Sequence, residues 1–282
     1  MSYLDSNTFY RFSNEQAQPN SAEDTLFIEL GQNHISSFIQ SAQDASISWF
    51  EMKQFKEPIS TELVEGYIAR LPFEAASFEK CHVIHHCIDA VLLPSEHHVE
   101  HLDQTILETV SGDLFERVIK SEDVFQWEIT NVYGVNTELF TSLEQSLPNA
   151  SHLHTNSVFL KSIFRQLSDM HEQWVKVYFY PSSFTVLVIK DEKLQLLQSY
   201  YYETPEDVMY QLLNITEQLI LDVTTLYLQV SGLIDEDSVL YTEMKKNFLE
   251  ISLEASPVEL KQSETATPPH YFTPILLSSL CV

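Results

Sequence analysis

A three-strand pattern occurs twice in this chain, and it narrows the possible folds more than any other feature. Residues 25–53 hold three β-rich runs, TLFIELG, ISSFIQ and ISWFEMK, and residues 174–202 repeat them as WVKVYFY, FTVLVIK and LQLLQSYYY. In each copy the first two runs flank a short connection, Gln32-Asn33-His34 or Pro181-Ser182-Ser183. Such runs joined by tight connections are typical of antiparallel strands. The sequence therefore predicts two similar units that each begin with a three-stranded meander.

Helices and further strands follow each meander. In the first half we expect a helix over 60–71, a strand over 81–93, a helix from about Glu96 to Lys120, a strand near 128–133, a helix after Asn136, a strand at Ala150–His154 and a helix from Thr155. In the second half we expect a helix after Thr204, a strand over 226–232, a helix after Asp235 and a strand at Phe248–Leu253. Strand–helix–strand crossovers imply parallel strands beside each meander, and hence an α/β fold with mixed sheets covered by helices.

Aligned end to end, the two halves share the element order βββαβαβ, and the first half ends with an extra helix. The first half also carries an insertion at about 72–122, between its first helix and the strand near 128–133. We therefore expect an N-terminal extension over 1–21, a first unit over 22–171, a second unit over 172–255 and an irregular tail over 256–282. The end of the tail, PILLSSLCV, is apolar without a basic face, so it is expected to dock on the body of the protein or on a partner.

The composition limits the classes of partner. The chain has 282 residues, with 41 acidic residues against 15 Lys and Arg, and its formal net charge is −26. This charge repels phosphate backbones and anionic lipid, so we expect no nucleic-acid binding and no membrane insertion. No run reaches the ~18 apolar residues that a membrane span requires, and no apolar secretory signal is evident. The three cysteines have no CxxC spacing, which predicts a cytoplasmic protein with reduced thiols.

Glycine is scarce in this chain. Only five glycines occur, Gly31, Gly66, Gly112, Gly134 and Gly232, and no two of them are near each other. Loops that cradle phosphate need clustered glycines, because the backbone must approach the ligand closely. The sequence therefore argues against a Walker loop, a dinucleotide fingerprint and a kinase glycine loop.

The duplicated element order, with its insertion in the first half, resembles the actin-like ATPase fold of actin, sugar kinases and Hsp70. In that fold each half is an RNase H-like βββαβαβ subdomain. The pattern is similar in particular to the pilus-assembly and cell-division branch (PilM and FtsA), whose small extra subdomain occupies the same place. It also resembles a family of uncharacterised bacterial proteins assigned to this fold. The resemblance covers about residues 22–255.

The resemblance implies where nucleotide chemistry would lie. In active members an Asp-x-Gly-type turn between the first two strands of each half holds metal and phosphate. Here the first turn reads Glu29-Leu30-Gly31, whereas the second reads Tyr180-Pro181-Ser182, and a proline removes a backbone N–H that a phosphate would use. The adenosine loop of the family carries paired glycines, of which only Gly232 is present. We therefore expect that ATP hydrolysis has been lost and that a degenerate nucleotide cleft remains around Glu29, Gly31 and Gly232.

A histidine run is the other local feature with chemical potential. His82, His86, His97 and His101 lie within twenty residues of one another. His97 and His101 have the i, i+4 spacing that places two ligands on one helix face, and His82 and His86 would point to the same side of a strand. The residues HHVEH do not form the HExxH zinc motif. A zinc or nickel site is one interpretation of the run; solvated or helix-capping histidines are the simpler one.

The leading hypothesis is a non-catalytic cytoplasmic scaffold that binds another protein through a degenerate actin-like framework. It needs no cofactor, and a homodimer is one form that the partnership can take. One alternative is a divergent ATP-binding protein or small-molecule kinase that uses Glu29 as a metal ligand. The other is a metal-binding protein that uses the histidines of residues 82–101.

Overall fold

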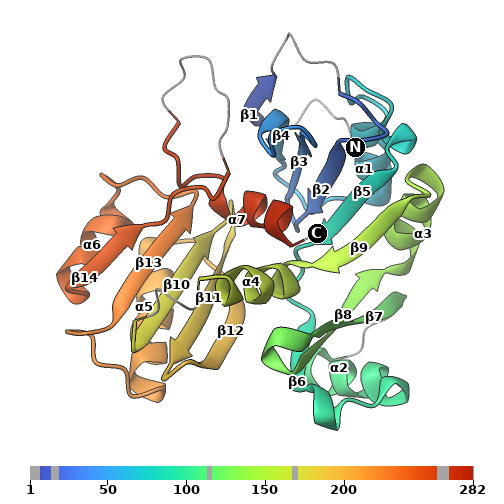
Figure 1. The fold of residues 1–282 in the computed structure, drawn as a ribbon. Helices are drawn as coiled ribbons and strands as arrows, with labels where there is room; N and C mark the ends of the chain where they lie inside the picture. The colour runs from blue at the N-terminus through green and yellow to red at the C-terminus, as the bar shows by residue number, and fades with distance from the viewer. Residues whose placement is uncertain (1–6, 14–18, 113–115, 167–170, 259–266, 282) are drawn as a thin grey trace. The chain divides into compact units, whose positions relative to one another are not determined.

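The computed structural model describes residues 7–13, 19–112, 116–166, 171–258 and 267–281. By its internal contacts the chain divides into two compact units. The first unit runs to Lys161 and also includes the residues from Ser278 onward. The second unit runs from Ser162 to Pro257 and also includes the segment that ends at Leu277. Each unit is built around one large mixed β-sheet (Figure 1).

The first large sheet contains the first copy of the meander and has the strand order β1-β4-β3-β2-β5-β9. Its strands are β1 (Asn7–Ser13), β2 (Thr25–Leu30), β3 (His34–Gln40), β4 (Ile47–Gln54), β5 (Lys80–His85) and β9 (Ala150–His154). β2, β3 and β4 pair in antiparallel order, as predicted, and β5 and β9 extend the sheet in parallel. The sequence does not predict β1, which pairs with β4 from within the expected N-terminal extension.

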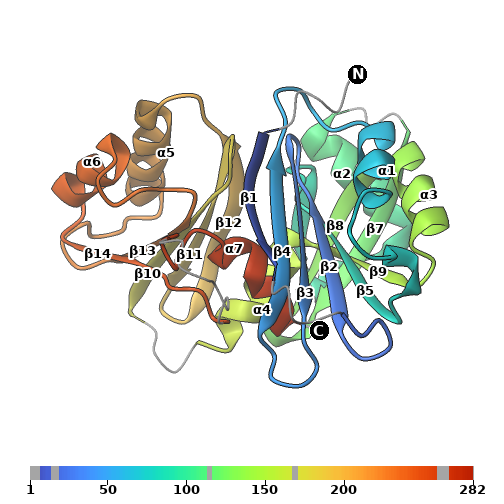
Figure 2. The same cartoon turned by 90° about the horizontal axis from the view of Figure 1, so that it is seen from above.

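Helices α1 (Thr61–Ile68) and α3 (Thr137–Ser146) lie side by side on one face of this sheet (Figure 2). Ser60 and Asn136 cap them, as the sequence predicts, because each side chain accepts a hydrogen bond from the backbone N–H three residues later. The 3₁₀ helix η2 (Ala75–Ser77) leads from α1 to β5. The apolar sides of both helices and the facing strand residues form one buried core, which includes Leu26, Ile28, Val64, Tyr67, Val83 and Leu143.

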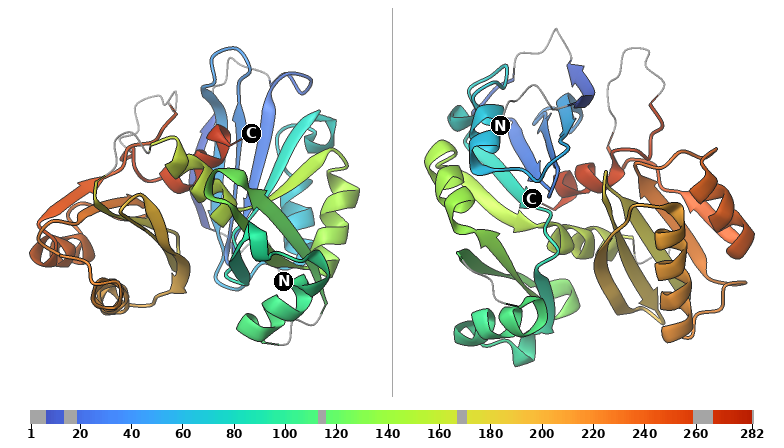
Figure 3. Two further views of the ribbon diagram at one scale, coloured as in Figure 1. Left: turned by 60° about the horizontal axis from the view of Figure 1, so that its bottom comes forward. Right: turned by 180° about the vertical axis from the view of Figure 1, so that it is seen from behind.

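A small subdomain lies between β5 and α3 in the sequence. It contains a three-stranded sheet with the order β6-β8-β7, and helix α2 packs against it (green in Figure 3). Its elements are β6 (Ala90–Pro94), the 3₁₀ helices η3 (Ser95–His97) and η4 (Glu100–Leu102), α2 (Asp103–Ser111), β7 (Arg117–Val124), the 3₁₀ helix η5 (Phe125–Trp127) and β8 (Ile129–Asn136).

Three predicted assignments in this region are wrong. The single strand expected over 81–93 is two strands, β5 and β6, which lie in different sheets. The sequence places the strand near 128–133 in the large sheet, but β5 takes that position between β2 and β9, and β8 lies in the small sheet. Both stretches are short and apolar, so periodicity alone cannot tell which one joins which sheet. The helix expected from Glu96 to Lys120 is also shorter, because Gly112 (φ 81°) ends α2 and β7 follows.

The second large sheet has the strand order β12-β11-β10-β13-β14. Its strands are β10 (Gln173–Phe179), β11 (Ser183–Lys190), β12 (Lys193–Tyr201), β13 (Tyr227–Gly232) and β14 (Glu250–Leu253). Helices α5 (Pro205–Gln218) and α6 (Val239–Asn247) cover one face (Figure 1). Thr204 caps α5 as predicted, in a capping box with Asp207. The cap of α6 is Ser238 and not the predicted Asp235.

The two halves therefore share the predicted order βββαβαβ, and each continues into a helix. In the first half this helix is α4 (Thr155–Phe164). In the second half α7 (Thr273–Leu276) and the 3₁₀ helix η7 (Leu277–Leu280) form within the tail, so the expectation of an irregular tail is wrong for this segment. Its apolar side chains are buried, and the predicted docking on the body of the protein is confirmed. Across the described part of the chain, no helix has the length and apolar character needed to cross a membrane.

Candidate functional site

The hairpins at the start of the two units occupy the position expected for phosphate loops. In the first unit the Gly31 N–H donates to the His34 carbonyl at 3.0 Å. In the second unit the Tyr180 N–H donates to the Ser183 carbonyl at 2.9 Å. The hairpins thus repeat the same hydrogen bond, and Gly31 corresponds to Tyr180.

The side chain of His34 fills the space beside Gly31. A Cβ atom on Gly31 would lie 2.0 Å from Cε1 of the His34 ring. This ring is buried, and its Nε2 lies 3.3 Å from Oε1 of Glu29, which is buried as well. The ring centroid of His86 is 5.8 Å from that of His34, and burial holds the pKa of His86 well below its usual value. Gly31 therefore makes room for a histidine of its own hairpin, and Glu29 contacts that histidine.

The second hairpin is closed by tyrosine and proline. Tyr180 is buried, and its carbonyl accepts a hydrogen bond from the Tyr202 hydroxyl at 3.2 Å. Pro181 has no backbone N–H to offer a ligand. Compared with a glycine loop, this hairpin has one donor fewer and bulky side chains at the turn.

Gly232 has a structural reason to be glycine. It ends β13, where it pairs with Phe179 of β10, and its φ is +92°. A Cβ atom there would lie 2.1 Å from the Phe179 carbonyl oxygen, which accepts a hydrogen bond from the Leu233 N–H at 3.0 Å. The Gly232 N–H donates to the His270 carbonyl at 2.8 Å. The backbone N–H at the position of the predicted adenosine loop is thus hydrogen-bonded to the C-terminal segment of the chain.

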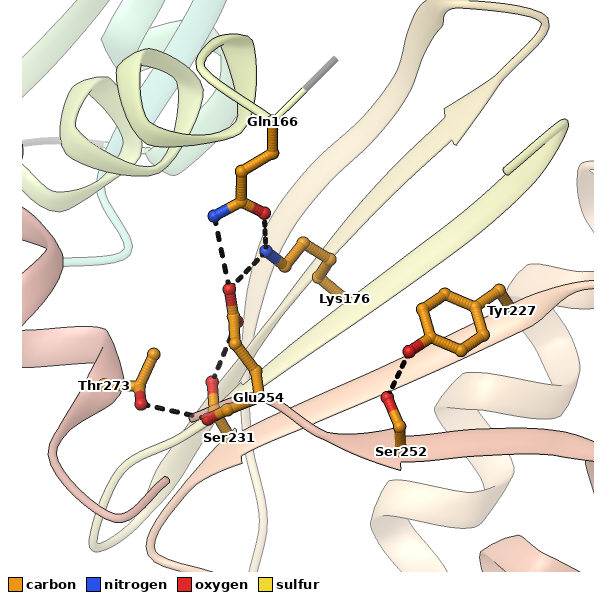
Figure 4. Close-up of polar contacts among 7 residues, drawn as sticks. All are labelled: Gln166, Lys176, Tyr227, Ser231, Ser252, Glu254 and Thr273. Atoms are coloured by element: carbon orange, nitrogen blue, oxygen red, sulfur yellow. Dashed lines mark hydrogen bonds and ion pairs between the residues drawn. The ribbon is translucent and has the colours of Figure 1, made fainter. Parts of the chain in front are cut away.

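The second unit also contains a buried ion pair that sequence analysis misses. Lys176 on β10 is fully buried, and its Nζ donates to Oε1 of Glu254 at 2.6 Å and to Oε1 of Gln166 at 2.9 Å (Figure 4). Burial lowers the pKa of Lys176, and the charge of Glu254 opposes that shift. The lone lysine in the apolar run WVKVYFY is the sequence signal that points to this pair.

Glu254 connects this ion pair to the end of the chain. Its Oε2 accepts a hydrogen bond from Ser231 Oγ at 3.4 Å, and its carbonyl accepts one from Thr273 Oγ1 at 3.0 Å (Figure 4). Ser231 is on β13 and Thr273 begins α7. The cluster therefore fastens α7 to the sheet within the second unit.

The four histidines considered as metal ligands lie on separate elements. His82 is in β5 with its ring hydrogen-bonded to Ser151, and His86 follows that strand. His97 and His101 belong to η3 and η4, two distinct 3₁₀ helices, so the prediction that they share one helix face is wrong. Among the residues that the structure describes, no group of three or more His, Cys, Asp or Glu side chains is arranged to hold a metal ion.

Other histidines of the first unit form hydrogen bonds that the sequence does not predict. His85 Nε2 lies 2.9 Å from His152 Nδ1, and His152 Nε2 lies 3.1 Å from Glu144 Oε1. Burial lowers the pKa of His85 well below its usual value, and positive charge on His152 adds to the shift. This chain of groups joins β5, β9 and α3.

His154 is buried in a single protonation state. Its Nδ1 accepts a hydrogen bond from the Asn156 N–H at 3.0 Å, so Nε2 carries the proton and donates to the Cys87 carbonyl at 2.9 Å. Burial lowers the pKa of His154 to about 4. The ring is therefore neutral at pH 7 and serves the fold.

The amino-acid sequence also matches a protein family. Residues 13–251 match the model of a family described as "Protein of unknown function (DUF3822)". The chain belongs to the DUF3822 family. No curated protein sequence matches it significantly.

Solved structures share the fold of this DUF3822 protein. A protein with actin-like ATPase fold and unknown function from Bacteroides thetaiotaomicron has a TM-score of 0.76 and 15% identity, over 93% of this chain and 97% of that chain. PilM in the PilM-PilN type IV pilus biogenesis complex has a TM-score of 0.60 and 10% identity, over 93% and 99%. The ethanolamine utilization protein EutJ from Carboxydothermus hydrogenoformans has a TM-score of 0.50 and 9% identity, over 95% and 92%. The predicted actin-like ATPase fold is confirmed.

Proposed function

We propose that this DUF3822 protein is a non-catalytic, cytoplasmic protein-interaction scaffold. In this proposal the actin-like nucleotide cleft around Glu29, Gly31 and Gly232 has degenerated. The observation that carries the proposal is the His34 ring, which stands 2.0 Å from the position of a Cβ on Gly31. In a working phosphate loop, the space beside the glycine belongs to the ligand.

The remaining contacts support the same conclusion. The Gly31 N–H is donated within its hairpin, Pro181 has none, and the Gly232 N–H is bonded to the His270 carbonyl. A carboxylate that holds Mg²⁺ must reach the ion and its waters, whereas Glu29 is 3% exposed and faces His34. Each feature removes a contact that ATP and its metal would need.

In this proposal the retained fold binds a partner protein. PilM, which is similar in fold, is solved in a complex with PilN. We infer by this analogy of fold that the present chain acts by holding another protein, and a second copy of the chain is one candidate. The net charge of −26 disfavours nucleic acid and anionic lipid as alternatives.

Isothermal titration with Mg-ATP, combined with a phosphate-release assay, tests the proposal. We expect neither micromolar binding nor turnover. Micromolar affinity together with turnover would refute the scaffold function and favour a divergent ATPase that uses Glu29. In that case Glu29→Gln should abolish phosphate release while the circular dichroism spectrum stays unchanged.

A further inference from the structure

A groove of about 710 Å³ lies at one end of the small sheet of the first unit. Pro94 at the end of β6 and Val124 at the end of β7 both pair with Ile129, the first residue of β8. The groove is formed there, where η3 and η5 leave the sheet. Its volume is in the range of pockets that enclose a drug-sized ligand, so it can take one or two side chains of a bound segment.

Hydrogen bonds fix the polar floor of the groove. Thr130 Oγ1 donates to Asp123 Oδ1 at 2.7 Å and lies 3.1 Å from Ser95 Oγ. The Ser95 N–H donates to the Glu128 carbonyl at 2.8 Å, which ties η3 to the start of β8. These contacts set the position of the Asp123 carboxylate before any ligand arrives, which lowers the entropic cost of binding.

Two aromatic side chains contribute to the apolar surface of the groove, together with Pro94 and Ile129. Trp127 is held in place because its Nε1–H donates to the Leu160 carbonyl at 2.8 Å. Phe125 is 80% exposed, although it is a large apolar residue. An exposed phenylalanine beside an anchored tryptophan is typical of interaction sites, where aromatic residues are enriched.

The charges in the groove have one sign. Glu96, Asp123 and Glu128 line it, and none of its described lining residues is Lys or Arg. The one histidine among them, His98, is hydrogen-bonded to Asp103 at 2.9 Å. Phosphate-bearing and other anionic ligands are therefore disfavoured here, whereas a cation gains from three carboxylates and from the aromatic faces.

We propose that this groove binds a short basic segment of a partner protein, with an apolar side chain against Phe125 and Trp127 and an adjacent Arg or Lys at Asp123. The inference rests on the proposed scaffold function and names the chemistry of the partner. An arginine suits the site better than a lysine, because its planar guanidinium can pair with a carboxylate and stack on a ring. The groove lies wholly within the first unit, so it does not involve the nucleotide loops of the second.

Fluorescence anisotropy with three labelled ten-residue peptides tests the proposal on the full-length protein. One peptide alternates arginine with leucine, the second has glutamate in place of arginine, and the third has serine in place of leucine. We expect the arginine–leucine peptide to bind at least about tenfold more tightly than either counterpart, since each of them lacks one of the two contacts. Its affinity should fall as salt rises.

Matched variants separate the groove from the general charge of the protein. Asp123→Asn keeps an oxygen for Thr130 but removes the charge, and Phe125→Ser changes a side chain that is mostly outside the core. Each substitution should lower the affinity for the arginine–leucine peptide about tenfold. The controls Asp237→Asn and Tyr210→Ser likewise remove one carboxylate charge and one exposed aromatic ring, but in the second unit, and should leave the affinity unchanged.

Two outcomes would overturn the groove proposal. One is that the arginine–leucine peptide does not bind. The other is that the groove variants and the control variants lower its affinity equally, which would assign binding to the overall negative charge. Neither depends on nucleotide. ATP turnover together with groove-dependent peptide binding would instead refute only the non-catalytic function.

Discussion

Replacing Gly232 with alanine should destabilise the second unit by about 2–3 kcal/mol. The residue has a φ of +92°, and a Cβ atom would lie 2.1 Å from the oxygen and 2.7 Å from the nitrogen of Phe179. Both are backbone atoms of the neighbouring strand, so they cannot rotate out of the way as a side chain can. Alanine therefore requires that the ends of β10 and β13 separate or that residue 232 adopt another φ.

The magnitude combines two effects. A non-glycine residue held at positive φ costs about 1–2 kcal/mol. Moving the Phe179 carbonyl also weakens its 3.0 Å hydrogen bond from the Leu233 N–H, which contributes about 1 kcal/mol. Gly112→Ala isolates the first effect, because φ is +81° there and, among the residues that the structure describes, no atom apart from its chain neighbours lies within 4 Å of the added Cβ. That variant should lose only about 1–2 kcal/mol.

Gly66→Ala supplies a control of opposite sign. Gly66 lies inside α1, and apart from its chain neighbours and the backbone of its own helix the nearest atom to its added Cβ is Arg70 Nη1 at 4.0 Å. Alanine should stabilise this helix by about 0.5–1 kcal/mol. Urea unfolding followed by circular dichroism ranks the three variants, and hydrogen exchange at β13 locates the loss in Gly232→Ala. A loss no larger than that of Gly112→Ala would show that the contact with Phe179 is not the reason for glycine at 232.

Three further predictions concern buried contacts. Gly31→Ala should lower the free energy of unfolding by about 2 kcal/mol in the wild type but by almost nothing in a His34→Ala background. A double-mutant cycle that shows no coupling between the two positions would contradict the steric contact. Lys176→Met should lower the free energy of unfolding by about 3 kcal/mol, because it leaves the Glu254 carboxylate without its cation. Adding Glu254→Gln should recover most of that loss in a urea titration. If nothing is recovered, the ion pair is not the reason for the loss. As pH falls from 6.5 towards 4, His154 becomes protonated in the unfolded state but stays neutral in the folded state, so the free energy of unfolding should drop by up to about 3 kcal/mol. The drop should be smaller in His154→Gln. Equal pH dependence of the two proteins would contradict the low pKa of His154.

Local sequence signals were sufficient for the framework of the fold. The two sets of three β-rich runs are joined by similar short turns, and they form β2–β4 and β10–β12. Ser60, Asn136 and Thr204 each cap the helix that they precede, since capping depends on residues within one turn. The duplicated actin-like order follows from these elements, because few topologies accommodate parallel strands joined by helices.

Assignments that depend on distant residues did not follow from the sequence. The sequence places a histidine-rich strand over 81–93 in the insertion, whereas β5 joins the large sheet through parallel pairing with β2 and β9. The spacing of His97 and His101 suggests one helix, yet the chain forms two 3₁₀ turns there before α2 begins. Pairing partners and helix starts of this kind are decided by packing.

The amino-acid sequence by itself determined that the chain is a duplicated α/β protein without the clustered glycines of phosphate loops, since strand runs, caps and residue identity are local properties. Tertiary structure decided what the remaining site residues do. Gly31 accommodates the ring of His34, and Gly232 lets the backbone of Phe179 approach. The reason is physical: a glycine at a close approach looks the same in sequence whether a ligand or the protein's own atoms fill the space. Only the folded chain brings those atoms into place.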